Sequence, residues 1–204
     1  MNHRGRQKNL RGQLASCRLD AVLISHLPNI RYLCGFTGSA GLLLVEESGS
    51  VLFTDVRYAT QSREQVEGAG VVIARKALVT ALAERVAGMR KRSNKWRIGI
   101  EADHLTVAEN KRLADLMPRG VQLGSAPPLV ERARMVKDAA ELECIRAAVL
   151  LGTRLFDRAL EVIRPGVREN EVAAEMEYAA RRAGAEEMSF PTIVASGEIG
   201  RAHV

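Results

Sequence analysis

The residues best placed to do chemistry form a glycine-rich stretch near the N-terminus. Gly35, Gly38 and Gly41 recur at intervals of three residues within positions 29–41. Loops of this kind can bring backbone N–H groups to a phosphate. The spacing fits neither the dinucleotide-binding pattern GxGxxG nor the nucleotide-binding pattern GxxxxGK[ST], and no lysine follows it. We therefore interpret residues 29–41 as a tight loop that enters a strand.

A second polar group follows the strand expected over residues 50–54. Asp55 stands where a helix should begin, and an aspartate there commonly accepts hydrogen bonds from the first unpaired N–H groups of the helix. We expect Asp55 to have this capping role. Arg57 and Tyr58 could reach a neighbouring chain, which their spacing alone leaves open.

Neither metal ligands nor nucleophiles follow from the sequence pattern. The four histidines are scattered at positions 3, 26, 104 and 203, and no HxxxH or HExxH pair occurs. Ser189 and Ser196 lack the GxSxG context of a hydrolase nucleophile. We interpret Cys34 as a buried structural thiol, because no basic cluster or helix start lies near it to lower its pKa.

The acidic residues of the second half suggest no site either. Glu171, Glu175 and Glu177 fall within one predicted helix, where they form a solvated face. The sequence therefore assigns no catalytic residue and no metal ligand, and the substrate-binding residues stay unknown.

The elements that position these residues alternate between strands and helices. Strand patterns occupy residues 21–24, 41–45, 50–54, 71–73, 97–100 and 121–123. Helix patterns occupy residues 9–17, 28–34, 57–66, 78–86 and 106–116, the last with Thr106 and Glu109 as a capping box. This alternation predicts an α/β domain.

A different pattern begins after the segment 124–128, which we interpret as a linker. Asp138 caps a helix that runs to about residue 163, a second helix spans 168–184, and a strand is predicted over 190–196. Six apolar residues share one stripe of the first helix: Leu142, Ile145, Val149, Phe156, Leu160 and Ile163. One strand and two helices do not bury a sheet, so we expect the domain that starts near residue 135 to be incomplete at residue 204.

Composition and charge limit the classes of partner that the protein is expected to bind. The net charge is +6 and the basic residues cluster at 4–11 and 85–97, where we expect a solvated terminus and a surface loop. No nucleic-acid motif accompanies them, and no apolar run is long enough for a membrane span. Three widely separated cysteines suit a reducing compartment. We expect a cytoplasmic protein that binds neither nucleic acid nor membrane.

Five stretches in a fixed order resemble the Xaa-Pro aminopeptidase and Xaa-Pro dipeptidase (prolidase) family. They are LPNIRYLCGFTGSAG at residues 27–41, TDVRY at 54–58, IGIE at 98–101, RMVKD at 134–138, and SFPTIVASG at 189–197. The similarity covers about residues 10–197. It implies a creatinase-type α/β domain, with a mixed sheet and flanking helices, over residues 1–130. It also implies the truncated start of an α+β metallopeptidase domain of the pita-bread fold over residues 135–204.

The resemblance also implies an activity. Family enzymes hydrolyse the bond before a proline at the second position of a peptide, as homodimers with two divalent metal ions (Mn²⁺, Co²⁺ or Zn²⁺). Their five metal ligands follow the stretch that matches 192–196, so none is carried over and we expect this chain to be inactive. His203 follows Ala202 where the family has a proline before its substrate-binding histidine, and we do not assign it. A creatinase-like hydrolase without metal and a non-catalytic binding protein of the same fold remain alternatives.

The last seven residues depart from the family pattern. Residues 198–204 can be encoded by GAG ATC GGA AGA GCA CAC GTC, which from its second base matches a common sequencing adapter. We therefore expect residues 198–204 to be a non-native tail, which the nucleotide sequence of the gene would test.

Overall fold

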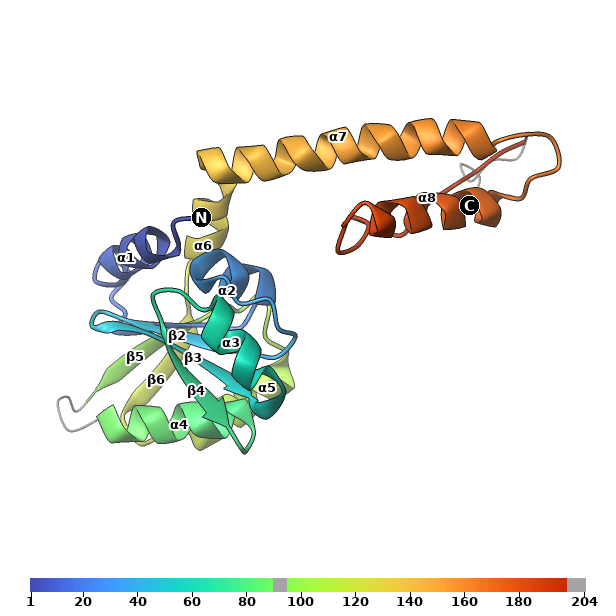
Figure 1. The fold of residues 1–204 in the computed structure, drawn as a ribbon. Coiled ribbons are helices and arrows are strands. Elements are labelled where there is room, and N and C mark those ends of the chain that lie inside the picture. Colours follow the sequence, from blue (N-terminus) through green and yellow to red (C-terminus); the bar gives the residue numbers. More distant parts are fainter. Residues whose placement is uncertain (90–94, 198–204) are drawn as a thin grey trace. The chain divides into compact units, whose positions relative to one another are not determined.

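A computed structural model describes residues 1–89 and 95–197 of the chain (Figure 1). The expected non-native tail, His203 and part of the expected basic surface loop lie outside the described residues. The chain divides into two compact units, Met1–Val136 and Lys137–Val204. Each unit is considered by itself below.

The first unit holds a six-stranded sheet. Its strands are β1 (Ala21–Ile24), β2 (Leu42–Glu46), β3 (Gly49–Asp55), β4 (Gly70–Ala74), β5 (Trp96–Ile100) and β6 (Val121–Ser125). The helices of this unit are α1 (His3–Leu14), α2 (Leu27–Cys34), the 3₁₀ turn η1 (Val56–Tyr58), α3 (Ala59–Gln65), α4 (Leu78–Met89), α5 (Val107–Leu116) and α6 (Leu129–Met135).

The sheet is mixed, in the order β4-β3-β2-β1-β5-β6. Strand β2 pairs antiparallel with β1 and β3, whereas the pairs β1–β5, β5–β6 and β3–β4 are parallel. The short turn between β2 and β3 allows an antiparallel hairpin, while the parallel pairs need crossover helices. Because β1 and β5 are parallel neighbours, their C-terminal ends lie side by side at the same end of the sheet.

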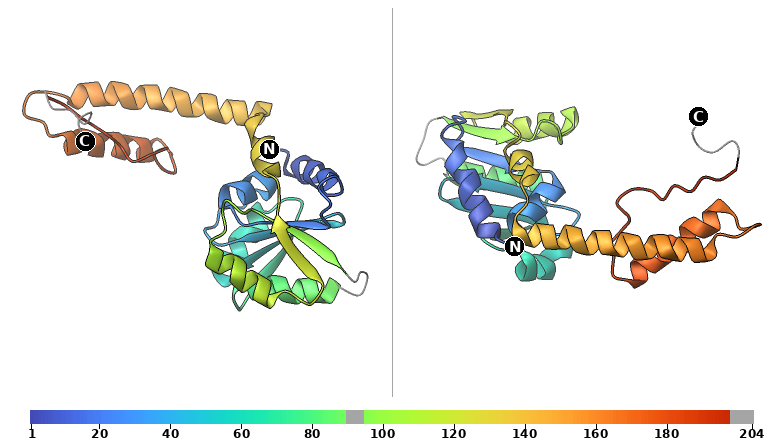
Figure 2. Two further views of the ribbon diagram at one scale, coloured as in Figure 1. Left: turned by 180° about the vertical axis from the view of Figure 1, so that it is seen from behind. Right: turned by 90° about the horizontal axis from the view of Figure 1, so that it is seen from above.

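Helices cover both faces of this sheet, which confirms the predicted α/β class. Alternate residues of β1 point to opposite faces: Val22 and Ile24 pack with residues of α1, α2 and α6, whereas Ala21 and Leu23 pack with residues of α4 and α5. Figures 1 and 2 show α4 on the opposite side of the sheet from α1 and α2.

The N-terminus is not the solvated segment that the sequence predicts. Helix α1 starts at His3, where the Asn2 side chain accepts a hydrogen bond from the N–H of Gly5. The Arg6 guanidinium lies 4.0 Å from the centre of the Tyr32 ring and donates to the Tyr32 carbonyl oxygen. This basic side chain packs on α2 because its apolar stem and planar head suit an aromatic face.

The linker predicted over residues 124–128 is wrong. Strand β6 continues to Ser125 and α6 begins at Leu129. Leu129 and Val130 are buried in the core on the α2 side of the sheet. The prolines at 127 and 128 therefore mark a turn within the first unit.

The second unit is a helical hairpin of α7 (Ala139–Val162) and α8 (Glu169–Arg182), which lie side by side (Figure 2). Asp138 and Glu141 form the predicted capping box of α7. The six residues of the predicted apolar stripe are exposed, and the buried residues of α7 are Leu155 and Ala159. No strand forms over residues 190–196, since an isolated segment has no neighbour to complete its hydrogen bonds.

Among the described residues, no helix is long and apolar enough to cross a membrane.

Candidate functional site

The glycine-rich loop is closed and leaves no obvious anion site. Gly35 has a φ of +83° and ends α2, with its N–H donating to the Arg31 carbonyl oxygen. A side chain at Gly38 would clash with Phe36 and Tyr58, whose rings meet edge to face. The Thr37 N–H donates to the Gln65 side chain. These contacts support the interpretation of a tight loop that enters β2.

Asp55 caps the turn after β3, as the sequence predicts. Its carboxylate accepts from the Arg57 N–H at 2.9 Å and from the Arg57 guanidinium at 3.0 and 2.8 Å. The guanidinium lowers the pKa of Asp55. The Tyr58 hydroxyl lies 2.6 Å from Ser39 Oγ, and this hydrogen bond lowers the pKa of Tyr58. Arg57 is exposed and Tyr58 is half-buried, and together they form a polar corner at the surface of the first unit.

A buried polar network lies beyond the ends of β1 and β5, and it is centred on Asn29. The Asn29 amide N–H₂ donates to Glu101 at 2.7 Å and to Glu131 at 2.5 Å, while its oxygen accepts from Arg134 at 2.7 Å. Glu101 also accepts from the backbone N–H groups of Ser25 and His26. Asn29 therefore connects α2, the end of β5 and α6.

The structure brings His26, His104 and Glu131 together beside this network, which the scattered sequence positions did not indicate. The two imidazole rings are stacked with centroids 3.7 Å apart, and His104 Nε2 lies 3.5 Å from Glu131 Oε1. One ligand-type atom from each residue lies within 4.8 Å of the others. Burial, and next the proximity of His104, lowers the pKa of His26. His26 follows β1 and His104 follows β5, and the two histidines meet because these strands pair in parallel. No signal in the sequence indicates this pairing.

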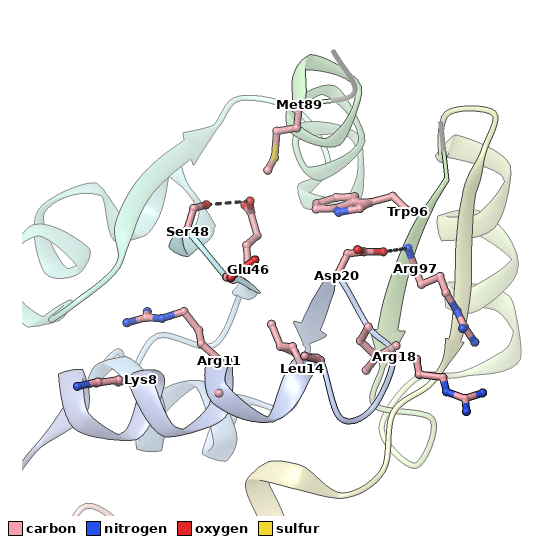
Figure 3. A pocket seen from close by; sticks show the side chains of 14 residues that line it. Lys8, Arg11, Leu14, Arg18, Asp20, Glu46, Ser48, Met89, Trp96 and Arg97 are labelled. Atoms are coloured by element: carbon pink, nitrogen blue, oxygen red, sulfur yellow. Dashed lines mark hydrogen bonds between the residues drawn. The ribbon is translucent and has the colours of Figure 1, made fainter. Parts of the chain in front are cut away.

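A wide hollow lies at the opposite ends of β1 and β5. It has a volume of about 1050 Å³ and is bordered by α1, the end of β2 and the start of β5 (Figure 3). Asp20 accepts a hydrogen bond from the Arg97 N–H at 2.8 Å. Burial raises the pKa of Glu46, which points toward Ser48 in this hollow. Acidic and basic side chains both line this hollow.

Cys34, the last residue of α2, is fully buried, and burial raises its pKa to about 11. A thiol in this state is inert. The sequence interpretation of Cys34 as a structural residue is confirmed.

Two acidic residues of the second unit have partners there, while Glu171 and Glu177 are exposed, as the sequence predicts. Glu175 forms an ion pair with Arg158 at 3.0 Å, and Glu169 accepts from the N–H and hydroxyl of Ser196. Within residues 137–197, the structure gathers no three His, Cys, Asp or Glu side chains that could hold a metal. The donor set of a two-metal centre therefore does not fit this part of the chain.

Two family models match the chain in succession. The model of the creatinase/prolidase N-terminal domain matches residues 6–136, and that of the metallopeptidase family M24 matches residues 143–203.

Relatives and solved structures agree with these matches. The uncharacterized peptidase YqhT of Bacillus subtilis is 32% identical over 190 residues, which are 93% of this chain and 52% of that protein. An Xaa-Pro dipeptidase from Bacillus anthracis has a TM-score of 0.82 and 28% identity. An X-Pro aminopeptidase from Thermotoga maritima has a TM-score of 0.80 and 30% identity. Both matches cover 93% of this chain and 52% of the solved one. The chain thus spans about half the length of the relatives it matches.

Proposed function

Since the chain belongs to the family of creatinase/prolidase N-terminal domains, we propose that it is part of an Xaa-Pro peptidase. The complete enzyme would hydrolyse the peptide bond between an N-terminal residue and a proline at the second position. The observation that carries this proposal is the succession of the two family models, creatinase/prolidase N-terminal domain and then M24, along one chain.

The proposed substrate rests on the similar solved structures, an Xaa-Pro dipeptidase and an X-Pro aminopeptidase, and the chemistry of proline explains why such an enzyme is needed. The bond before proline is a tertiary amide without an N–H, so ordinary backbone recognition of a substrate is lost and a dedicated pocket is needed. The similar solved structures include both a dipeptidase and an aminopeptidase. We therefore propose Xaa-Pro specificity and leave the length of the peptide to the substrate panel below.

The proposed chemistry needs residues beyond those described. The resemblance implies two divalent metal ions, Mn²⁺, Co²⁺ or Zn²⁺, held by ligands that follow residue 197. The described part of the second unit has no matching donor set, so no catalytic step is assigned to its residues. We propose that the 204-residue chain is inactive on its own.

We propose that the complete protein is cytoplasmic and a homodimer, with the first unit as its N-terminal domain. The polar corner of Arg57 and Tyr58 is the surface of the first unit that we would expect to reach the partner. Arg57 is anchored by two hydrogen bonds to Asp55, so its orientation is set before any partner arrives.

The test uses the complete gene product, obtained by extending the reading frame past Gly197. The purified protein is assayed with Mn²⁺, Co²⁺ or Zn²⁺, or with EDTA, on the dipeptide Met-Pro, the tripeptide Met-Pro-Ala and the control Met-Ala-Ala. Creatine is included as a further substrate. We expect metal-dependent cleavage before proline and no cleavage of Met-Ala-Ala.

Each alternative has its own outcome. Hydrolysis of creatine without added metal would point to a creatinase-like enzyme, and no turnover of any substrate would point to a binding protein of the same fold. Either result would overturn the proposal. Cleavage of the tripeptide would identify an aminopeptidase, and cleavage of the dipeptide alone would identify a dipeptidase.

A further inference from the structure

Three side chains in the first unit have the composition of a metal site, although they are far apart in the sequence. His26 is the N-cap of α2, His104 lies in the loop after β5, and Glu131 lies in α6. Two imidazoles and a carboxylate form a ligand set found around Zn²⁺ and related borderline cations.

The distances suit such a cation. Ligand atoms around a tetrahedral Zn²⁺ at about 2.0–2.2 Å are separated by roughly 3.3–3.5 Å. His104 Nε2 and Glu131 Oε1 are already 3.5 Å apart, and all three ligand-type atoms lie within 4.8 Å. The stacked rings must tilt toward each other to share one ion. His104 lies in an exposed loop, so its ring can make most of this movement.

An unpaired nitrogen is a second and independent observation. Nδ1 of His26 is buried and has no hydrogen-bond partner in the described part of the chain. A buried polar atom without a partner is costly and calls for an explanation, of which an absent ion is one. Glu101 is the weaker candidate ligand, since Ser25 and His26 donate to its Oε2 and Asn29 donates to its Oε1. The Asn29 hydrogen bond to Glu131 engages Oε1 of that carboxylate.

The position in the fold is also that of a ligand site. A cavity of about 30 Å³ opens beside His104, Glu131 and Glu101, enough for about one water molecule. It lies outside the carboxyl ends of the parallel neighbours β1 and β5, where open α/β sheets commonly bind their ligands. Three protein ligands around a tetrahedral ion leave a fourth position, which a water molecule could occupy.

We propose that His26, His104 and Glu131 form a binding site for a divalent cation of the Zn²⁺ type in the first unit. The ion would join the start of α2, the loop after β5 and helix α6, and would thereby stabilise the folded unit. This site goes beyond the proposed peptidase function, because none of its residues belongs to the M24 part of the chain.

The experiment measures binding to the 204-residue chain after EDTA treatment and dialysis. Zn²⁺ titration by calorimetry gives the stoichiometry, and Co²⁺ gives a visible absorption spectrum that reports the coordination geometry. The fluorescence of Trp96, the only tryptophan and part of β5, follows thermal unfolding of the first unit with and without Zn²⁺. None of these measurements requires peptidase activity.

Three variants and one control identify the ligands. Glu131→Gln keeps the oxygen that accepts from Asn29 but removes the charge, and His104→Ala alters an exposed loop. His26→Ala removes the third ligand. Asp103→Asn, an exposed acid that lines the same cavity, is the matched control for general attraction of cations.

We expect one ion per chain, a tetrahedral Co²⁺ spectrum and a higher Tm with Zn²⁺. His26→Ala, His104→Ala and Glu131→Gln should each weaken binding by at least about tenfold and abolish the rise in Tm, while Asp103→Asn behaves as wild type. Absence of binding, an octahedral spectrum, or equal binding by wild type and the three ligand variants would overturn the proposal.

Discussion

At Asn29, one side chain of ordinary size connects three separate segments. The residue is fully buried and all its side-chain hydrogen bonds go to charged groups, Glu101, Glu131 and Arg134. Hydrogen bonds to charged groups are stronger than neutral ones, and a buried partner left unpaired adds its own cost. The stability of the first unit should therefore depend strongly on this amide.

Asn29→Ala should lower the free energy of unfolding of the first unit by about 2–4 kcal/mol. Urea unfolding followed through Trp96 fluorescence measures the loss. Asn110→Ala, on the exposed face of α5, is the control and should change stability by less than about 0.5 kcal/mol. Equal stability of the two variants would contradict the assigned role of Asn29.

Glu46 gives the first unit a distinct dependence on pH. Burial raises its pKa in the folded state above that in the unfolded state. The folded state therefore holds the proton more tightly, and stability is lost as the pH rises through the raised pKa. Glu46→Gln removes this loss.

The Tm of Glu46→Gln should exceed that of wild type at pH 7, and the difference should shrink toward pH 4. Differential scanning fluorimetry across this range measures it, with the exposed neighbour Glu47→Gln as the control. If the difference in Tm between Glu46→Gln and wild type stays constant with pH, the ionised Glu46 carboxyl is not destabilised by burial.

Cys34 and Cys144 should differ sharply in reactivity. Cys34 is buried with a pKa of about 11, whereas Cys144 is exposed on α7. Iodoacetamide at pH 8, followed by peptide mass spectrometry, should label Cys144 and leave Cys34 unmodified until the protein is unfolded. Rapid labelling of Cys34 in the native protein would contradict its burial.

The sequence predicts local roles of residues better than their distant contacts. The caps formed by Asp55, Thr106 and Asp138 are local, because donor and acceptor lie within three residues of each other. His26 and His104 meet only because β1 and β5 pair in parallel. A single sequence does not specify that pairing, so the histidines seem unrelated until the sheet is known.

At the scale of elements, the hydrophobic pattern predicts that a segment is helical more reliably than it predicts which of its side chains are buried. Apolar residues do recur along one side of α7, yet the side chains of Phe156 and Leu160 are more than half exposed. The hairpin offers no sheet on which the stripe could pack. Conversely, α6 was missed because the prolines before it indicated a linker, although Leu129 and Val130 are core residues.

The hairpin should be digested before the first unit. Few of its side chains are buried, so local opening costs little free energy. Limited digestion with Glu-C protease, analysed by intact mass, should leave a product that ends at Glu141 or Glu143. Early cleavage at Glu131 within α6 would contradict the assignment of residues 1–136 to one compact unit.

At the scale of the whole molecule, the five ordered motifs predict the family, and the matches to both family models confirm it. The α/β class of the first unit was predictable because its strands, and its helices apart from α6, carry their own hydrophobic patterns. The catalytic site was not, because the described residues of the second unit supply no metal-ligand set. Activity is therefore a property that we propose for the complete protein.

The most direct test compares Xaa-Pro cleavage by the complete gene product and by the 204-residue chain under identical conditions. Release of methionine from Met-Pro and Met-Pro-Ala is measured with Mn²⁺ and with EDTA. We predict Mn²⁺-dependent turnover by the complete protein, its loss in EDTA, and no turnover by the 204-residue chain. Turnover by the short chain, or none by the complete protein with any of the three metals, would contradict the account.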